Sequence, residues 1–294
     1  MNNKFGSIHI ISTHPYILPL LLDLSMQTYK NFEIILVDSL FRYRTKVVKK
    51  VADKLGLNVK HYSDIYNSSH IAGAKQAIYR NECISHMNDK VDRIIFLDDH
   101  QRVNDTFIEG HMNNDNNVLT IGRWFEMRGS NLVNFNPNVN LTDILNEYTY
   151  DERLKPIDFG GFWTCNSSTS KEYVSGVNGF DNRYTGGTGG EDYDLAYRIV
   201  KKYRSKGENV EFKYESNSIA FHFNHDIYSR PKKCNHNPSY FAENPYENGD
   251  REAYSDKKII STWNLGVKMW YCPNCGKRGI VDSLQVFDLN MKNW

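Results

Sequence analysis

The chain has 294 residues, of which 40% are hydrophobic, 24% charged and 13% aromatic, a composition that excludes a disordered or collagen-like chain. With 36 lysines and arginines against 35 aspartates and glutamates, the net charge is close to zero, so a polyanion would need a local basic patch. The longest apolar stretch, Tyr16 to Leu22, is too short to cross a membrane, and the first residues lack the apolar core of a signal peptide. We therefore expect a cytoplasmic protein with reduced cysteines.

The first third of the chain alternates between apolar runs and amphipathic segments. The runs FEIILV (32–37) and RIIFL (93–97) are continuous and bounded by polar residues, as in strands that are buried on both faces of a parallel sheet. Further strands are expected at 7–12 and 58–61, and helices at 19–26, 45–55 and 71–87. This βαβαβαβ order predicts an α/β fold, with a mixed, mostly parallel sheet flanked by helices.

The second half of the chain is less regular. Residues 123–155 are rich in asparagine and weakly periodic, so we expect loops there, with one helix at 141–150. After them we expect a strand and turn at 158–170, a helical turn at 171–175, a helix at 191–206 and a strand at 219–223. Beyond Arg230 the composition shifts to lysine, asparagine, tyrosine and proline. We expect a main domain over 1–230, with a donor half at about 1–122 and an acceptor half at about 123–230, and an extension over 231–294.

Polar segments follow three of the predicted strands, at 13–15, 38–39 and 98–100. Ligands of such sheets lie beyond the carboxyl ends of the strands. Asp98, Asp99 and His100 provide carboxylates and an imidazole, which suit a divalent metal that would neutralise a diphosphate leaving group. The alternative is an acidic loop that caps a helix or turns the chain.

A second acidic segment begins the predicted helix at 191–206, directly after the glycine-rich loop GGTGG (186–190). A partly desolvated carboxylate of Glu191 or Asp192 could accept a proton from a hydroxyl nucleophile, while its neighbour orients the acceptor. The alternative is an acidic first turn that only complements the helix dipole.

Two segments of the first half resemble the nucleotide-sugar glycosyltransferases of the GT-A fold, particularly family 2. The segment LLLDLSMQTYKNFEIILVDS is similar to the opening helix and second strand of that family, with Ser39 in place of a second aspartate. The segment AKQAIYRN is similar to a family helix that ends in Arg80 and Asn81, although Tyr79 stands where alanine is usual. The resemblance extends from about Ser7 to His225.

Two further segments carry the motifs of the family's chemistry. FLDDH occupies the D-x-D position, with the D-x-H form that resembles mucin-type N-acetylgalactosaminyltransferases. NGFD (178–181), followed by GGEDYDL (189–195) and Arg198, is similar to a motif shared by family 2 and the β-galactosyltransferases. By this resemblance Asp192 is the catalytic base, and the intact Glu-Asp pair favours inversion at the sugar carbon.

The resemblance implies a glycosyltransferase that moves a sugar from a nucleoside diphosphate, preferably UDP, to an acceptor hydroxyl on a glycan. Catalysis is assigned to Asp192 with Glu191, and Mn²⁺ or Mg²⁺ to Asp98, His100 and His222, with His225 as the alternative to His222. The expected donor-binding residues are Thr13, His14, Pro15, Asp38, Lys75, Arg80, Asn81 and Asp99. The expected acceptor-binding residues are Trp163, Tyr184 and Gly190, although core packing is an equal interpretation of Trp163.

The C-terminal extension contains Tyr-Cys-Pro-Asn-Cys-Gly (271–276), the form of a zinc knuckle. Cys272 and Cys275 provide half of a tetrahedral site, which Cys234 and His236 could complete. The alternative is a pair of free or redox-active thiols.

Three other functions stay open from the sequence. Basic residues at 230–233 and 277–278 would suit an acceptor hydroxyl on a hydroxymethylated DNA base. A metal-dependent nucleotidyltransferase also places acids at strand ends, but it would release pyrophosphate rather than a nucleoside diphosphate. A binding module without activity is the third, and it does not explain why the metal and base motifs are both present.

Overall fold

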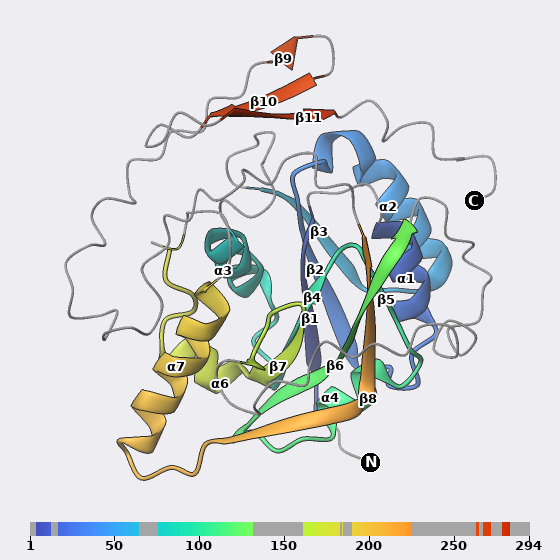
Figure 1. Cartoon of the computed structure of the whole chain (residues 1–294). Helices are drawn as coiled ribbons and strands as arrows, with labels where there is room; N and C mark the ends of the chain where they lie inside the picture. Colours follow the sequence, from blue (N-terminus) through green and yellow to red (C-terminus); the bar gives the residue numbers. More distant parts are fainter. Residues whose placement is uncertain are drawn as a thin grey trace.

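The protein is described here by a computed structural model, shown in Figure 1. The structure describes residues 4–12, 17–64, 76–131, 161–182, 184 and 190–224, and the short segments 263–264, 267–271 and 278–282. The described elements of the first half are β1 (Gly6–Ser12), α1 (Ile17–Ser25), β2 (Phe32–Asp38), α2 (Phe41–Leu55), β3 (Val59–Ser63), α3 (Gln76–His86), β4 (Arg93–Asp98), β5 (Gln101–Val103) and α4 (Phe107–Met112). Those that follow are β6 (Val118–Asn131), β7 (Asn166–Ser170), α6 (Lys171–Gly176), α7 (Glu191–Arg204) and β8 (Glu211–Asn224).

These strands form one mixed sheet in the order β3-β2-β1-β4-β7-β6-β8-β5. The pairs β1–β2, β1–β4, β2–β3 and β6–β8 are parallel, whereas β7 runs antiparallel to β4 and β6, and β5 antiparallel to β8. The predicted α/β class and the alternation of strands and helices in the first third of the chain are therefore confirmed. Because β1, β2 and β4 are parallel neighbours, their carboxyl ends at Ser12, Asp38 and Asp98 meet at one edge of the sheet.

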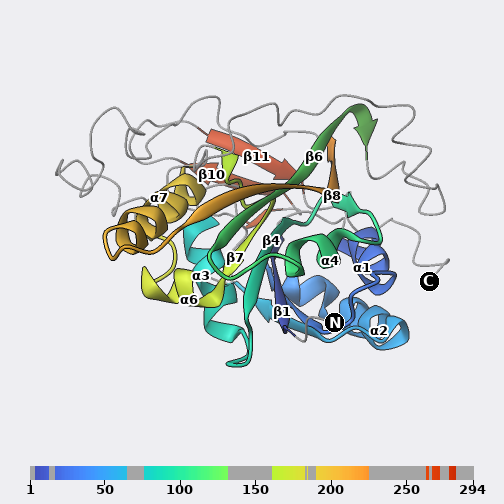
Figure 2. The ribbon, with the colours of Figure 1, turned by 90° about the horizontal axis from the view of Figure 1, so that it is seen from below.

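Helices cover both faces of the sheet, with α1 and α2 on one side and α3, α6 and α7 on the other (Figures 1 and 2). The alternation along β4 explains this arrangement. Ile95 and Leu97 pack in a cluster with α1 and α2, whereas Ile94 and Phe96 pack in a cluster with α3, α6 and α7. A strand that is buried on both faces reads as a continuous apolar run, as β4 does.

The helix α2 begins at Phe41, four residues before the predicted start at Thr45. The backbone N–H of Leu40 donates to Asp38 Oδ1 at 2.6 Å, which turns the chain into the helix directly after β2. The helix ends as predicted at Gly56, whose φ of 66° is the left-handed conformation that favours glycine. The early start places Arg44 in the first turn of α2, where it folds back on Asp38.

The expectation of loops from residue 123 onward is wrong for the start of that segment, because β6 continues to Asn131. The strand β8 is also longer than the predicted 219–223, since it begins at Glu211. The two strands pair in parallel from Val118 opposite Glu211 onward. Polar residues interrupt the apolar ones along both strands after at most three positions, so neither has the long apolar run by which buried strands are found in a sequence. The predicted helix at 141–150 lies outside the described residues.

In the C-terminal part, β9 (Trp263–Asn264), β10 (Val267–Tyr271) and β11 (Arg278–Asp282) form a separate antiparallel sheet in the order β11-β10-β9. Strands β10 and β11 pair from Val267 opposite Asp282 to Tyr271 opposite Arg278, whereas Cys272 and Cys275 lie outside the described residues. The zinc site and the domain boundary near residue 230 stay predictions. In the part of the chain that the structure describes, no helix has the length and apolarity needed to cross a membrane.

Candidate active site

The D-x-H motif lies where β4 ends and the chain turns into β5. Strand β5 pairs antiparallel with β8, so that Gln101 lies opposite His222, and the Phe223 N–H donates to the His100 carbonyl oxygen at 3.2 Å. This pairing places His222 beside His100, although the two residues are 122 positions apart. The convergence that the D-x-H motif and His222 required is therefore present in the fold.

Asp98, His100 and His222 each direct one ligand atom to a common point, and these atoms all lie within 4.8 Å of one another. The Nε2 atoms of the two histidines are 2.6 Å apart, and the rings meet edge to face with centroids 4.3 Å apart. His100 is buried, while Asp98 and His222 are half-buried. Two imidazole nitrogens and one carboxylate oxygen fit a divalent transition metal and leave coordination positions for water or phosphate oxygens.

Asp99 was expected to contact the donor, but its carboxylate faces inward and is only 2% exposed. Its Oδ1 accepts a hydrogen bond from His100 Nδ1 at 2.8 Å, and its Oδ2 accepts one from Ser12 Oγ at 2.6 Å. A carboxylate bound to the second nitrogen of a histidine fixes the tautomer and ring orientation of a metal ligand. The structure therefore places Asp99 against the Nδ1 of His100, where it can orient this candidate ligand.

Arg80 lies between the metal motif and the N-terminus of α7. Its side chain is 2% exposed, its Nη2 is 3.2 Å from Asp98 Oδ1, and its guanidinium lies over the ring of Phe96. Burial raises the pKa values of Glu191 and Asp192, and the charge of Arg80 opposes this rise, so Arg80 acts on both acidic segments. Asp98 and the pair at 191–192 therefore belong to one electrostatic site rather than to separate surfaces.

The acidic pair begins α7 behind Gly190, whose φ of 104° is open to glycine but strained for other residues. The Asp192 carboxylate accepts hydrogen bonds from the N–H groups of Tyr193 at 2.9 Å and Thr164 at 3.4 Å. Burial, together with the neighbouring charges of Asp192 and Asp98, raises the pKa of Glu191 to about 8 against the opposing effect of Arg80. Burial also raises the pKa of Asp192, against the hydrogen bonds of Tyr193 and Thr164. A half-buried carboxylate of raised pKa is a stronger base than one in water.

Asp38, at the end of β2, was expected to hold the base or ribose of the donor. It is fully buried, and its carboxylate forms a bidentate ion pair with Arg44, at 2.6 Å to Nε and 2.7 Å to Nη2. His61 Nε2 lies 2.8 Å from Asp38 Oδ2. Burial alone would raise the pKa of Asp38, but Arg44 and His61 outweigh it and hold the pKa below its ordinary value. Both oxygens of the Asp38 carboxylate therefore bind side chains of the protein.

Asn81, the second residue expected at the diphosphate, instead holds the NGFD turn. Its Oδ1 accepts from the Phe180 N–H at 2.8 Å, and its Nδ2 donates to the Phe180 carbonyl oxygen at 2.8 Å and to Asn182 Oδ1 at 2.7 Å. A Cβ atom on Gly179 would lie 2.4 Å from Asn81 Oδ1, so the turn also requires glycine. The AKQAIYRN and NGFD segments thus contact each other through the hydrogen bonds of Asn81.

The two aromatic candidates for the acceptor differ in their surroundings. Trp163 is half-buried, its Nε1 donates to the Tyr193 hydroxyl, and its ring meets Trp124 edge to face at 6.0 Å. It therefore stands beside the acidic start of α7. Tyr184 is 4% exposed and packs in the hydrophobic cluster of α3, α6 and α7. Of the two rings, only that of Trp163 is in a position to stack on a sugar without leaving the core.

Several predicted residues lie outside the described part of the chain. These are Thr13, His14, Pro15, Lys75, His225, Cys234, His236, Cys272 and Cys275. Their roles stay predictions.

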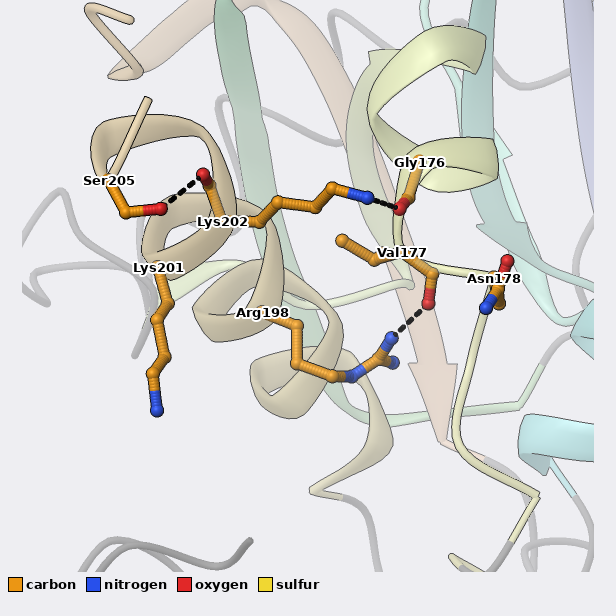
Figure 3. Close-up of a pocket in the computed structure, with 7 residues that line it drawn as sticks. All are labelled: Gly176, Val177, Asn178, Arg198, Lys201, Lys202 and Ser205. Atoms are coloured by element: carbon orange, nitrogen blue, oxygen red, sulfur yellow. Dashed lines mark hydrogen bonds between the residues drawn. The ribbon is translucent and has the colours of Figure 1, made fainter. Parts of the chain in front are cut away.

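A pocket of about 500 Å³ is lined by residues of α7 and of the end of α6, and none of its lining residues is a predicted site residue (Figure 3). Two of the cationic side chains that line it, those of Arg198 and Lys202, already donate hydrogen bonds to backbone carbonyl groups. Arg198 donates to the carbonyl oxygens of Val177 at 2.7 Å and Gly179 at 2.8 Å, and Lys202 donates to that of Gly176. These bonds satisfy carbonyl groups that the end of a helix leaves open. We interpret this pocket as part of the helix packing and not as the active site.

Three residues of the site were missed from the sequence, namely Ser12, Arg44 and His61. Ser12 could have been found, because it ends the first predicted strand and so lies at the ligand edge of the sheet. Arg44 and His61 carry no such signal, since they are recognised only by their contacts with Asp38.

Residues 151–226, about a quarter of the chain, match the family described as the N-terminal domain of galactosyltransferase. Comparison with curated protein sequences gives no match. Among solved structures, residues 1–349 of TarS from S. aureus in complex with UDP are similar, with 15% identity, a TM-score of 0.50, and coverage of 75% of this chain and 60% of the TarS chain.

A mutant of the Drosophila β1,4-galactosyltransferase 7, in complex with manganese, UDP-Gal and xylobiose, is 13% identical with a TM-score of 0.40, and 94% of each chain is covered. At 60% coverage, this chain spans less than two thirds of the length of the TarS chain. The family match and the fold of TarS confirm the predicted resemblance to glycosyltransferases of the GT-A fold, and they support a transferase enzyme.

Proposed function

We propose that this glycosyltransferase of the GT-A type transfers a sugar from UDP to a glycan hydroxyl, with inversion at the sugar carbon and with a divalent cation. The observation that carries the proposal is the convergence of Asp98, His100 and His222, with Arg80 between this cluster and the acidic start of α7. TarS, whose fold this chain shares, is seen in complex with UDP, which supports UDP as the carrier.

Asp98, His100 and His222 would hold the cation, and His222 must then carry its proton on Nδ1 so that both Nε2 atoms present lone pairs. When bound, the cation would neutralise the charge that develops on the departing diphosphate. Asp98 also keeps its contact with Arg80, so the guanidinium adds a fixed positive charge to the same side of the site.

Asp192 is the proposed base. It accepts the proton of the acceptor hydroxyl while that oxygen forms a bond to the sugar carbon, and the bond from this carbon to the phosphate oxygen breaks on the opposite face. The N–H groups of Tyr193 and Thr164 hold the carboxylate in place, and Trp163 supplies a ring for the acceptor to stack on. Glu191, which is more deeply buried than Asp192, orients rather than accepts.

The experiment is an assay of UDP release from a panel of UDP-sugars with Mn²⁺, with glycans and hydroxymethylated DNA as separate acceptors. We expect Asp192→Asn to lower kcat by about 10²- to 10⁴-fold and to leave the affinity for UDP unchanged, because the base acts only on the acceptor. Glu172→Gln, which neutralises an exposed acid in the first turn of α6, is the matched control and should keep its activity. Normal turnover by Asp192→Asn contradicts the assignment, and release of pyrophosphate would indicate nucleotidyl transfer instead.

A further inference from the structure

A chain of buried hydrogen bonds connects β3 to the metal-binding cluster. His61 and Arg44 bond to Asp38, and the Nη2 of Arg44 also donates to Ser12 Oγ. Ser12 then donates to Asp99, whose other oxygen accepts from His100. We call these residues the relay: His61, Asp38, Arg44, Ser12, Asp99 and His100.

The residues of the relay come from different strands and from α2, which meet at this edge of the sheet. Ser12 ends β1, Asp38 ends β2, Arg44 lies in α2, and Asp99 follows β4. Ser12 is 1% exposed and Asp99 is 2% exposed, so water does not compete for these bonds. A buried network of this kind holds its members in one arrangement, because breaking one bond leaves a polar group unpaired in the core.

The direction of these hydrogen bonds determines which ring nitrogen of His100 carries the proton. A carboxylate only accepts, so His100 must carry its proton on Nδ1, where Asp99 Oδ1 lies 2.8 Å away. The lone pair of the neutral ring is then on Nε2, the atom that faces His222. Ser12 has one proton, which it donates to Asp99, and this leaves its oxygen to accept from Arg44.

We propose that Asp99, Ser12 and Arg44 are positioning residues that hold His100 in the tautomer and rotamer required for metal binding. This inference rests on the proposed metal-dependent transfer, but it concerns residues that contact neither donor nor acceptor. It also assigns a role to Asp38, since the carboxylate fixes Arg44 through two bonds and so anchors the far end of the relay.

The test measures Mn²⁺ binding by the whole chain, from the free-Mn²⁺ signal in electron paramagnetic resonance, for the wild type, Asp99→Asn and Ser12→Ala. We expect Asp99→Asn to weaken Mn²⁺ binding by about 10- to 100-fold, as is typical for partners of metal-ligating histidines, and Ser12→Ala to weaken it by a smaller factor of about three or more. Ser7→Ala is the matched control, because Ser7 is buried at the opposite end of the same strand and bonds to Glu33. Its Mn²⁺ affinity should equal that of the wild type.

A second readout is the ¹⁵N spectrum of the imidazole of His100 in the metal-free protein. We expect a protonated Nδ1 in the wild type and a mixture of tautomers in Asp99→Asn, which a purely structural role of Asp99 would not produce. If Asp99→Asn does not fold, Ser12→Ala decides the question by the same two measurements.

Each outcome separates the relay from the proposed function. Unchanged Mn²⁺ affinity in folded Asp99→Asn and Ser12→Ala, with sugar transfer intact, overturns the relay and leaves the transferase. A wild type that binds no Mn²⁺, but transfers sugar, overturns both the relay and the metal site. Weakened Mn²⁺ binding in the two variants and not in Ser7→Ala supports the relay, whatever the acceptor proves to be.

Discussion

The carboxylates of Asp38 and Glu191 are both buried, yet their pKa values shift in opposite directions. Asp38 is 0% exposed, and Arg44 and His61 lower its pKa in spite of burial. Glu191 is 3% exposed, and burial, together with the charges of Asp192 and Asp98, raises its pKa to about 8. Burial is thus almost the same in the two regions, and the ratio of cations to carboxylates decides the sign.

The difference indicates which region is complete and which requires a ligand. At Asp38 one carboxylate has a bidentate arginine and a histidine, so its charge is compensated within the protein. Around Arg80 the carboxylates of Asp98, Glu191 and Asp192 share the field of one guanidinium. A bound divalent cation would supply the positive charge that this second region lacks, which agrees with the ligand atoms of Asp98, His100 and His222.

The largest expected effect is that of Arg80→Met. Arg80 is buried, and its removal leaves the half-buried carboxylate of Asp98 without its cation, so we expect the free energy of unfolding to fall by about 3 kcal/mol, the lower end of the range for buried pairs, as measured by urea denaturation. Because a cation can replace part of the lost charge, Mn²⁺ should raise the melting temperature of Arg80→Met by more than it raises that of the wild type.

Arg44→Met is the matched comparison for this prediction. It also breaks a buried ion pair, but that pair lies in the compensated region. We expect its melting temperature to gain no more from Mn²⁺ than the wild type does. An equal gain from Mn²⁺ in both variants would contradict the distinction between the two regions.

The second prediction uses the raised pKa of Glu191 and is made without metal. Between its ordinary value of 4.5 and its folded value of about 8, the folded chain keeps a proton at Glu191 that the unfolded chain has lost. This contribution to stability is therefore complete below pH 4.5 and is lost as the pH rises toward 8. Glu191→Gln does not titrate, so its melting temperature should exceed that of the wild type by roughly 2–5 °C at pH 8 and by little at pH 5.

Differential scanning fluorimetry at several pH values, in the presence of a chelator, checks this expectation. Glu172→Gln is again the control, because that acid is exposed and its removal should not produce a difference that grows with pH. A constant difference between Glu191→Gln and the wild type from pH 5 to pH 8 would refute the assignment.

The smallest effect is expected for Lys201→Met, which removes an exposed cation beside the pocket of Figure 3. The net charge changes as much as in Arg80→Met, but the group is solvated, so the free energy of unfolding should change by less than about 0.5 kcal/mol. Sugar transfer should also be unchanged. A large loss of activity in Lys201→Met would show that this pocket belongs to the site after all.

Much of the first half of the fold was predictable, since its signals are local. The apolar runs that became β2 and β4 could be read directly, and Gly56 ends α2 because a left-handed residue is needed there. The long strands β6 and β8 were not predictable in full, because each is half polar and is stabilised by its pairing with the other.

The candidate site divides in the same way. The acids at the end of β4 and the start of α7 were identified from their positions next to predicted elements. The residue types did not show which way the side chains face, so Asp99 and Asn81 were expected at the donor, whereas the structure directs them to His100 and to the turn at Phe180.

The sequence by itself indicated the α/β class and the carboxyl ends of β1, β2 and β4, because hydrophobic periodicity is a property of neighbouring residues, and its resemblance to a family pointed to the candidate metal and base motifs. Only the tertiary structure decided that His222 meets His100, that Arg80 is shared by the two acidic segments, and that Ser12 and Arg44 support Asp99. Those relations depend on pairing between strands that are distant along the chain and on burial that removes competing water, and neither is encoded in any single segment.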